Sequence, residues 1–212
     1  MEALCDECSW DTAASDSRRA GYDRIRFSER GKPMRRMMLA FTVKRTMSLL
    51  RESEDRSSMA SFSECGKYRY VLGRRWRPDG GIVAFVSLNP STADETRDDP
   101  TVRRLIGFAK RWGYGGLRVV NVFAYRATQP TAILQADDPV GAENDGEIAG
   151  ACREADRVVV CWGNHGEWFG RAAQVRQLLL DSGFRLWCFG RTQHGHPKHP
   201  LYLPASTRLR RC

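Results

Sequence analysis

The sequence lacks any long hydrophobic run, and no apolar stretch approaches the roughly 20 residues that span a bilayer. Its first residues, MEALCDECSWD, are acidic and lack the basic-then-apolar order of a signal peptide. The seven cysteines are an odd number scattered along the chain, and the lone CxxC of Cys5 and Cys8 has no second pair to complete a zinc site. We therefore expect a cytoplasmic protein with no membrane partner and no resident metal.

Three sequence signatures of common enzymes are also missing. The chain contains no P-loop, no GxGxxG and no GxSxG sequence. These patterns let phosphates approach the backbone or place a serine on a strained turn. Their absence removes the usual signs of nucleotide hydrolysis, dinucleotide binding and serine esterase chemistry, and we predict no cofactor.

Positive charge is in excess, and most of the excess lies in the C-terminal part. The 34 Lys and Arg against 25 Asp and Glu give a net charge of +9, of which residues 63–212 carry +7. A basic folded region fits an anionic partner, with nucleic acid or a nucleotide first. The alternative is a composition effect without functional meaning, because Arg outnumbers Lys 29 to 5.

Residues 1–62 show no sustained strand or helix period, apart from a weak amphipathic stretch at 34–50. Charges of both signs and serines alternate through the rest, so we expect a disordered N-terminal extension. All six methionines lie in the first 59 residues, which makes Met59 a credible translation start and 1–58 an over-long assignment. A basic helix over 35–51 that docks on an anionic surface is the alternative.

From residue 62 onward the hydrophobic pattern becomes regular. Strands are predicted at 68–72, 82–88, 117–123, 157–162 and 185–189, the first as an edge strand and the others as the four strands of a parallel core. Helices are predicted after the N-cap pair Asp99-Pro100, at 144–155, and between Trp168 and Gly183. Alternating strands and helices indicate βαβ units. We predict one α/β domain over 63–212, a three-layer sandwich with a mainly parallel four-stranded sheet.

Polar residues gather in the segments expected beyond the carboxyl ends of the strands, where open α/β sheets bind ligands. These segments are 89–94, 121–128, 162–166 and 190–202. All four histidines of the chain fall in the last two of them. This clustering is the clearest sign of a site that the residues alone provide.

Several of these residues also have a structural interpretation. Asn89 before a proline is typical of a turn cap, and Asn121 in an apolar strand is compatible with a satisfied core amide. The HxHxxH pattern of His194, His196 and His199 resembles a metal cluster, although a loop interrupted by Pro and Gly defines no ligand geometry.

One face of the helix after Asp99 is basic. It carries Arg103, Arg104, Lys110 and Arg111. A solvated helix face and a phosphate-contacting surface are both compatible with this pattern.

Several long motifs follow one another in the chain: SLNPSTADETRDDPTVRRLIGFAKRWGYGGLRVVNVFAYRAT, DPVGAEND, VVVCWGNHG and HGHPKHPLYLP. In this order they resemble the bacterial and phage family catalogued as domain of unknown function 1643. The resemblance covers residues 63–204 and brings no established activity.

A weaker resemblance is to the uracil-DNA glycosylase superfamily, whose domain is a four-stranded parallel sheet between helices. Asn89-Pro90 resembles the motif that positions the attacking water, and Asn121 matches the strand asparagine that reads the base. His199 resembles the histidine that stabilises the departing base anion, with His196 as the alternative match. Trp162 resembles the tryptophan of the Trp-Gly pair that follows a later strand.

Together these observations lead to one functional hypothesis, a glycosylase-like domain that binds a nucleobase in nucleic acid or a nucleotide and hydrolyses its N-glycosidic bond. The expected catalytic residues are Asn89, His199 and Asp94. The expected substrate-binding residues are Pro90, Ser91, Asn121, Arg126, Trp162, His165, Arg191, His196 and Lys198. A non-catalytic nucleic-acid or nucleotide binder and a metal-dependent hydrolase built on the histidine loop are the alternatives. We expect a monomer.

Overall fold

Seven strands form one sheet within residues 57–212, the part of the chain that the computed structural model describes. The strands are β1 (Ser57–Phe62), β2 (Arg69–Arg75), β3 (Ile82–Ser87), β4 (Gly116–Asn121), β5 (Arg157–Val160), β6 (Leu186–Cys188) and β7 (Arg210–Arg211). The α-helices are α2 (Pro100–Arg111), α3 (Asn144–Arg153) and α4 (Arg171–Asp181), and the 3-10 helices are η1 (Pro130–Gln135), η2 (Asn164–Gly170) and η3 (Pro200–Tyr202). The α/β class is therefore confirmed.

The sheet is mixed, so the expected four-stranded, mainly parallel sheet is wrong. Its order is β1-β2-β4-β3-β5-β6-β7, and the parallel pairs are the three between β4, β3, β5 and β6 at the centre. β2 and β1 are added antiparallel on one side and β7 on the other. The two outermost strands carry mostly exposed side chains, so they lack the buried pattern by which a strand is recognised in a sequence.

Strand β1 also changes the domain boundary. Residues 57–62, which we expected in the N-terminal extension, pair with β2 along their whole length. The strand expected at the edge, β2, is therefore covered on both sides. The remainder of the extension and the helix considered at 35–51 lie outside the described residues.

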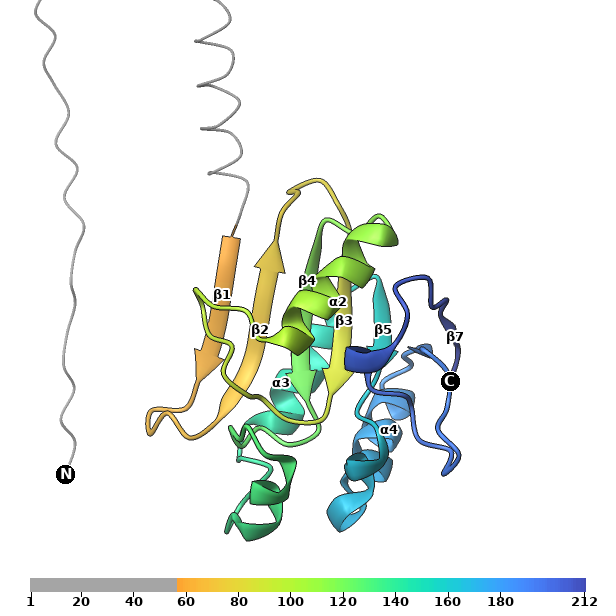
Figure 1. The fold of residues 1–212 in the computed structure, drawn as a ribbon. Coiled ribbons are helices and arrows are strands. Elements are labelled where there is room, and N and C mark those ends of the chain that lie inside the picture. Colours follow the sequence, from red (N-terminus) through yellow and green to blue (C-terminus); the bar gives the residue numbers. More distant parts are fainter. Residues whose placement is uncertain (1–56) are drawn as a thin grey trace, which may run out of the picture. The chain divides into compact units, whose positions relative to one another are not determined.

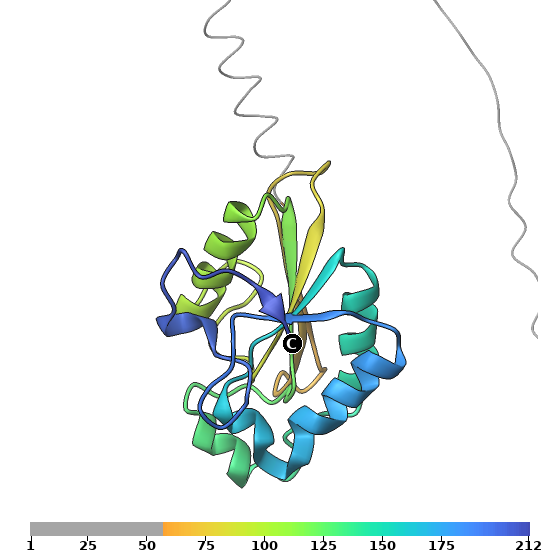
Figure 2. The same cartoon turned by 90° about the vertical axis from the view of Figure 1, so that its right-hand side faces the viewer.

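Helices cover both faces of the sheet (Figures 1 and 2). Helix α2 and η3 lie on one face, called here the α2 face, and α3 and α4 lie on the other, the α3–α4 face. The core of the α2 face is made of Leu72, Val83, Phe85, Ala93, Val102, Leu105, Phe108, Ala109, Leu117, Val119, Val159, Cys161 and Phe189. On the α3–α4 face, residues such as Val86, Val120, Val160, Ile148 and Val175 pack together.

Helix α2 begins where the sequence predicts. The carboxylate of Asp99 accepts a hydrogen bond from the backbone N–H of Val102 at 2.8 Å, and Pro100 occupies the first helical turn. An N-cap of this kind satisfies one of the free N–H groups at the start of a helix. The helix ends at Arg111 with Trp112 as its C-cap, and Gly113 follows with a φ of 84° that suits glycine.

The four parallel strands, β3, β4, β5 and β6, bring the loops that follow them to one edge of the sheet. β3, β4 and β5 all run downward in Figure 1, so the segments after them meet at the lower edge, called here the carboxyl edge. Beyond the ends of β3 and β4 the ladder continues, because the N–H groups of Val122 and Phe123 donate to the carbonyls of Ser87 and Leu88. Within residues 57–212 no helix is long and apolar enough to cross a membrane.

The N-cap of α2 gives a first prediction. Replacing Asp99 by Ala should lower the free energy of unfolding by about 1 kcal/mol, because the N–H of Val102 loses its acceptor. Asp99→Asn should retain most of the stability, since Asn is an equally good N-cap. Urea denaturation of the variants measures both values. Asp79→Ala is the control, because that carboxylate is 87% exposed and should contribute almost nothing; an equal loss in the control would contradict the assignment.

Candidate functional site

Three of the predicted residues converge at the carboxyl edge on the α2 face. Asn121 ends β4 and lies opposite Ser87 of β3 in the parallel register, while Asn89 follows β3 two residues later. His199 precedes η3, which contacts α2, and its Cβ lies beside Gly163 at the end of β5. The end of β4, the loop after β3 and the loop before η3 therefore place two amides and an imidazole at the same edge of the sheet.

Asn121 is almost completely buried and has an unsatisfied side chain. It is 1% exposed, and its Nδ2 has no hydrogen-bond partner among the described residues. Leu117 and Val119 of the same strand belong to the core of the α2 face, so strand alternation directs the Asn121 side chain to that face as well. The alternative of a satisfied core amide does not describe this residue. An unpaired buried amide costs about 1–3 kcal/mol.

The backbone that carries Asn121 is held by two buried polar residues. Asn144 Nδ2 donates to the carbonyls of Asn121 and Val122 at 3.1 and 3.2 Å, and Arg171 Nε donates to the carbonyl of Val122 at 2.8 Å. Arg171 also forms an ion pair with Asp145. These contacts fix β4 to α3 and α4 at the position where the strand ends. Sequence reasoning missed both residues, although each is a polar side chain at a position where its helix faces the sheet.

Asn89 joins the loops that follow β3 and β4. Its Nδ2 donates to the carbonyl of Ala127 at 2.7 Å and to that of Pro90 at 3.0 Å, and the N–H of Ala127 donates back to Pro90 at 2.9 Å. Asn89 is therefore more than a turn cap within its own loop. Because both amide hydrogens are used, its carbonyl oxygen is the group that remains to accept a hydrogen bond from a water or a ligand.

His199 is held in one tautomer at the other side of this region. Its Nδ1 accepts a hydrogen bond from the N–H of Leu201 at 3.4 Å. Burial lowers the pKa of His199, and the nearby Asp99 carboxylate opposes that effect only in part. The imidazole is therefore neutral at pH 7, and its proton lies on Nε2 as a donor.

The acidic loop between β3 and α2 uses its carboxylates for its own structure. Asp94 Oδ1 accepts hydrogen bonds from the N–H groups of Thr96 and Arg97, both at 2.8 Å, and these bonds lower the pKa of Asp94. Asp98 pairs with Arg74 at 2.9 Å, and Asp99 caps α2. The predicted catalytic residue Asp94 is thus half-buried, and its carboxylate holds the turn in which it lies.

Arg69 of β2 is a second unusual buried polar residue, and sequence reasoning missed it. It is 2% exposed and donates from one terminal nitrogen to the carbonyl of Ala93 at 2.7 Å, while its Nε has no partner among the described residues. Burial lowers the pKa of Arg69 to about 10, although the charge of Asp99 favours the protonated form. The available signal was an arginine inside the otherwise apolar RYVL segment.

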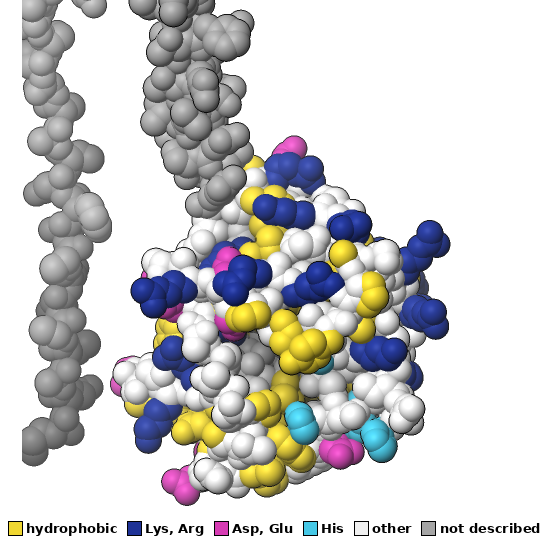
Figure 3. All heavy atoms as spheres, in the orientation of Figure 1, with side chains coloured by type: hydrophobic (Ala, Val, Ile, Leu, Met, Phe, Trp, Pro, Cys, Tyr) yellow, Lys and Arg dark blue, Asp and Glu magenta, His cyan; other side chains and the backbone are white. Residues whose placement is uncertain are grey.

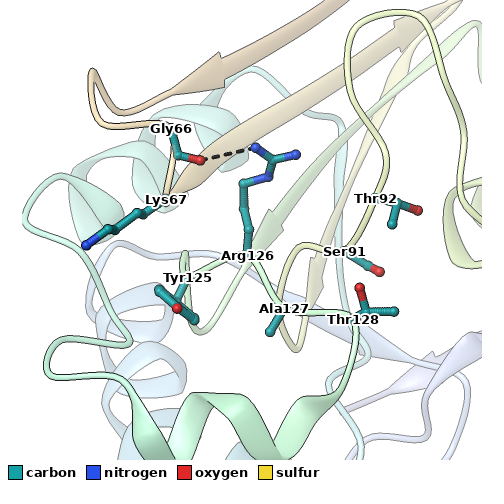
Figure 4. A pocket seen from close by; sticks show the side chains of 8 residues that line it. All are labelled: Gly66, Lys67, Ser91, Thr92, Tyr125, Arg126, Ala127 and Thr128. Atoms are coloured by element: carbon teal, nitrogen blue, oxygen red, sulfur yellow. Dashed lines mark hydrogen bonds between the residues drawn. The ribbon is translucent and has the colours of Figure 1, made fainter.

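A polar pocket of about 340 Å³ lies beside Asn89, between the loops after β3 and β4 (Figure 4). It contains two predicted residues, Ser91 and Arg126, and six others: Gly66, Lys67, Thr92, Tyr125, Ala127 and Thr128. Arg126 donates to the carbonyl of Gly66 at 3.1 Å and lies over the ring of Phe62. The lining carries two cationic residues, four side-chain hydroxyls and no acidic residue.

Three of the predicted substrate-binding residues have other surroundings. Trp162 is 3% exposed and belongs to the core of the α3–α4 face, where its ring packs against Gly166. His165 is exposed and stacks on Trp168 with ring centroids 4.4 Å apart. Pro90 is buried beneath the loop that Asn89 holds.

The histidine loop does not bring its ring nitrogens together. His196 Nε2 lies 3.0 Å from Glu167, His194 is exposed, and His199 is directed to Leu201. In residues 57–212 no three His, Cys, Asp or Glu side chains form a group that would hold a metal ion. In the same loop Arg191 donates to the carbonyl of Gly195 at 2.9 Å, and Lys198 is exposed. This geometry gives the metal-dependent hydrolase no support.

Comparisons with known proteins find one stretch shared with a curated enzyme. The 2-succinyl-5-enolpyruvyl-6-hydroxy-3-cyclohexene-1-carboxylate synthase of Parasynechococcus marenigrum (strain WH8102) is 37% identical over 83 residues. This stretch is 39% of the present chain but 15% of the synthase, so the chain spans a small part of that relative. No solved structure matches.

A comparison with models of protein families matches a longer part of the chain. The model of a family described as "Protein of unknown function (DUF1643)" matches residues 69–201, which include all the strands of the sheet except β1 and β7 and every described α-helix. The comparisons do not confirm the resemblance to the uracil-DNA glycosylase superfamily. Because the match covers more than half of the sequence, the chain belongs to the DUF1643 family.

Proposed function

We propose that the carboxyl edge of the sheet binds a nucleobase and that the domain hydrolyses the N-glycosidic bond of that base. The observation that carries this proposal is the buried amide of Asn121, whose Nδ2 is left without a partner on the α2 face. A fold that keeps an unpaired amide at the ligand-binding edge of its sheet is best explained by a ligand that completes its hydrogen bonds.

The chemistry of an amide suits the edge of a base. Asn offers a donor and an acceptor side by side, and the hydrogen-bonding edges of nucleobases offer the complementary pair. The flanking polar pocket of Ser91 and Arg126 suits the phosphate or sugar attached to such a base. Both features favour a nucleotide unit over an uncharged ligand.

The reaction would use Asn89 and His199. The Asn89 carbonyl oxygen orients a water whose oxygen bonds to the anomeric carbon, while the carbon–nitrogen bond breaks and its electron pair leaves with the base. The neutral His199 Nε2–H stabilises the resulting base anion by a hydrogen bond. Asn89 cannot accept a proton, so the water loses its proton to solvent after bond cleavage has advanced.

One observation favours the alternative of a non-catalytic nucleobase binder. The three aspartates of the loop after β3 are engaged in a turn, an ion pair and a helix cap, so none is free to act as a general base. The two functions differ in one result: the binder holds the base without releasing it.

Loss of the Asn89 side chain should separate these functions. We expect Asn89→Ala to reduce base release by at least about 10²-fold, because the attacking water is no longer oriented. The assay incubates the full chain with oligonucleotides that carry uracil, hypoxanthine or oxidised bases and scores alkali-labile abasic sites. Asn164→Ala is the matched control, since Asn164 is an exposed asparagine of the same edge. Binding without release by the wild type would establish the binder instead.

Exchange of the Asn121 amide should change which base is bound. Asn121→Asp replaces the donor by an acceptor, and one lost base contact of this kind is worth about 1–3 kcal/mol. We therefore expect the preferred base to lose roughly 5- to 150-fold in affinity, with little change for a base-free abasic oligonucleotide. Competition binding measures both. Equal loss for the abasic ligand would show that Asn121 supports the fold rather than the base.

The lowered pKa of His199 gives a stability prediction. The pKa of His199 is lower in the folded chain than in the unfolded chain, so the unfolded chain takes up a proton at a higher pH. The contribution of neutral His199 to the free energy of unfolding is therefore complete above about pH 6.5. It is lost as the pH falls through the lowered pKa of the folded state. Urea denaturation between pH 7.5 and 5 should show a smaller loss of stability for His199→Gln than for the wild type. His194→Gln, at an exposed position, should follow the wild type. A wild-type pH profile in His199→Gln would contradict the prediction.

A further inference from the structure

A basic groove runs along α2, away from the carboxyl edge. It has a volume of about 180 Å³ and is lined by Arg103, Arg104, Gly107, Phe108, Arg111 and Ala205. Dark-blue cationic side chains are spread over this part of the surface in Figure 3. The lining contains three arginines and no acidic residue.

These arginines are left without carboxylate partners. Among residues 57–212 no ion pair involves Arg103, Arg104 or Arg111. Arg104 lies over the ring of Phe108, and its buried Nε has no hydrogen-bond partner among the described residues. The neighbouring Lys110, in contrast, lies over the ring of Trp76. Arg103 donates one hydrogen bond to the backbone carbonyl of Asp98. Guanidinium groups that no carboxylate neutralises are well suited to bind phosphate oxygens.

Gly107 occupies the middle of this groove and the interior of α2. Glycine destabilises a helix interior relative to alanine. A Cβ at Gly107 would meet nothing within 4 Å, so no neighbouring group in the described fold requires a glycine there. Its absence of a side chain instead leaves the helix backbone open to close approach from outside.

An exposed aromatic side chain lies on the segment that forms the other wall. Tyr202 ends η3 and is 89% exposed, and Ala205 three residues later lines the groove. Helix η3 contacts α2. Proteins bind single-stranded nucleic acid with a cationic groove for the phosphates and exposed aromatic rings on which bases stack, and here the exposed ring lies on the segment that also supplies Ala205.

We propose that the α2 groove binds the phosphodiester backbone of single-stranded nucleic acid and that Tyr202 stacks with one of its bases. This inference rests on the proposed function, and it makes the ligand of the carboxyl edge a base within a strand rather than a free nucleotide. Helix α2 starts at the carboxyl edge, and the groove is lined by its residues from Arg103 to Arg111, which span about 12 Å along the helix axis. A nucleic-acid strand spans the length of the groove, whereas one nucleotide does not.

The test measures binding of fluorescent 20-nucleotide DNA and RNA strands to the full chain at several salt concentrations. Arg103→Ala and Arg111→Ala should each weaken binding several-fold and reduce the slope of log K against log salt by about 0.7. Arg176→Ala removes an exposed arginine of α4, on the opposite face, and should leave the slope unchanged. Tyr202→Ala should weaken binding with the slope retained, because stacking releases no counterions.

The variant Gly107→Leu tests whether weaker binding of nucleic acid could come from a loss of folding. Leucine is a strong helix former with open space at this position, so the thermal midpoint should not fall. The side chain fills the groove, and strand affinity should drop at least tenfold. A stable Gly107→Leu protein that binds strands as the wild type does would overturn the proposal.

Other outcomes separate this inference from the proposed function. Equal affinity for a nucleoside monophosphate and for single-stranded nucleic acid, or tighter binding of duplex, would overturn the proposed binding in the α2 groove. The base preference set by Asn121 would still be testable in that case. Binding of single-stranded nucleic acid that depends on Arg103 and Arg111 but not on the identity of the base would support the proposed binding in the groove. It would contradict the proposed base site at the carboxyl edge. A preference for DNA or for RNA supports the groove in either case and identifies the sugar.

Discussion

Two buried polar side chains hold the end of β4, and the candidate site depends on that attachment. Asn144 and Arg171 donate hydrogen bonds to the carbonyls of Asn121 and Val122, where the strand leaves the regular ladder. Backbone carbonyls buried at such a point need donors, and α3 and α4 supply them from the far face of the sheet. Asn121 is thereby fixed by contacts to its main chain, and its side-chain Nδ2 has no hydrogen-bond partner among the described residues.

Arginines of β2 stabilise the loop that carries Asn89. Arg69 donates to the carbonyl of Ala93, and Arg74 pairs with Asp98 and donates to the carbonyl of Asp94. In the acidic run between β3 and α2, Asp98 is therefore paired with a cation, while Asp94 and Asp99 accept hydrogen bonds from backbone N–H groups. The ion pair of Asp98 reduces the repulsion that this loop would exert on a phosphate at the carboxyl edge.

The parts of the fold that follow from hydrophobic burial could be predicted, and the parts that follow from polar contacts could not. The buried run at 82–88 and the Asp99-Pro100 cap gave β3 and the start of α2 almost to the residue. β1 escaped prediction because its exposed serines show no alternation, and Arg69 escaped because nothing in the sequence reveals that a distant loop carbonyl receives it. Trp162 was assigned to the site by motif, but strand alternation places it on the α3–α4 face.

The proposed ligand would offset an energetic cost at Asn121. A valine there would fill similar volume without an unpaired donor, as valines do at positions 119, 120 and 122 of the same segment. The unsatisfied amide costs about 1–3 kcal/mol, a large fraction of the roughly 5–15 kcal/mol by which domains are stable. A similar argument applies to Gly107, where alanine would strengthen α2 without a clash. Both residues make the fold less stable than the alternatives would, Asn121 at the carboxyl edge and Gly107 along the basic groove. Single-stranded nucleic acid that extends from the groove to the carboxyl edge would explain both residues by the same ligand.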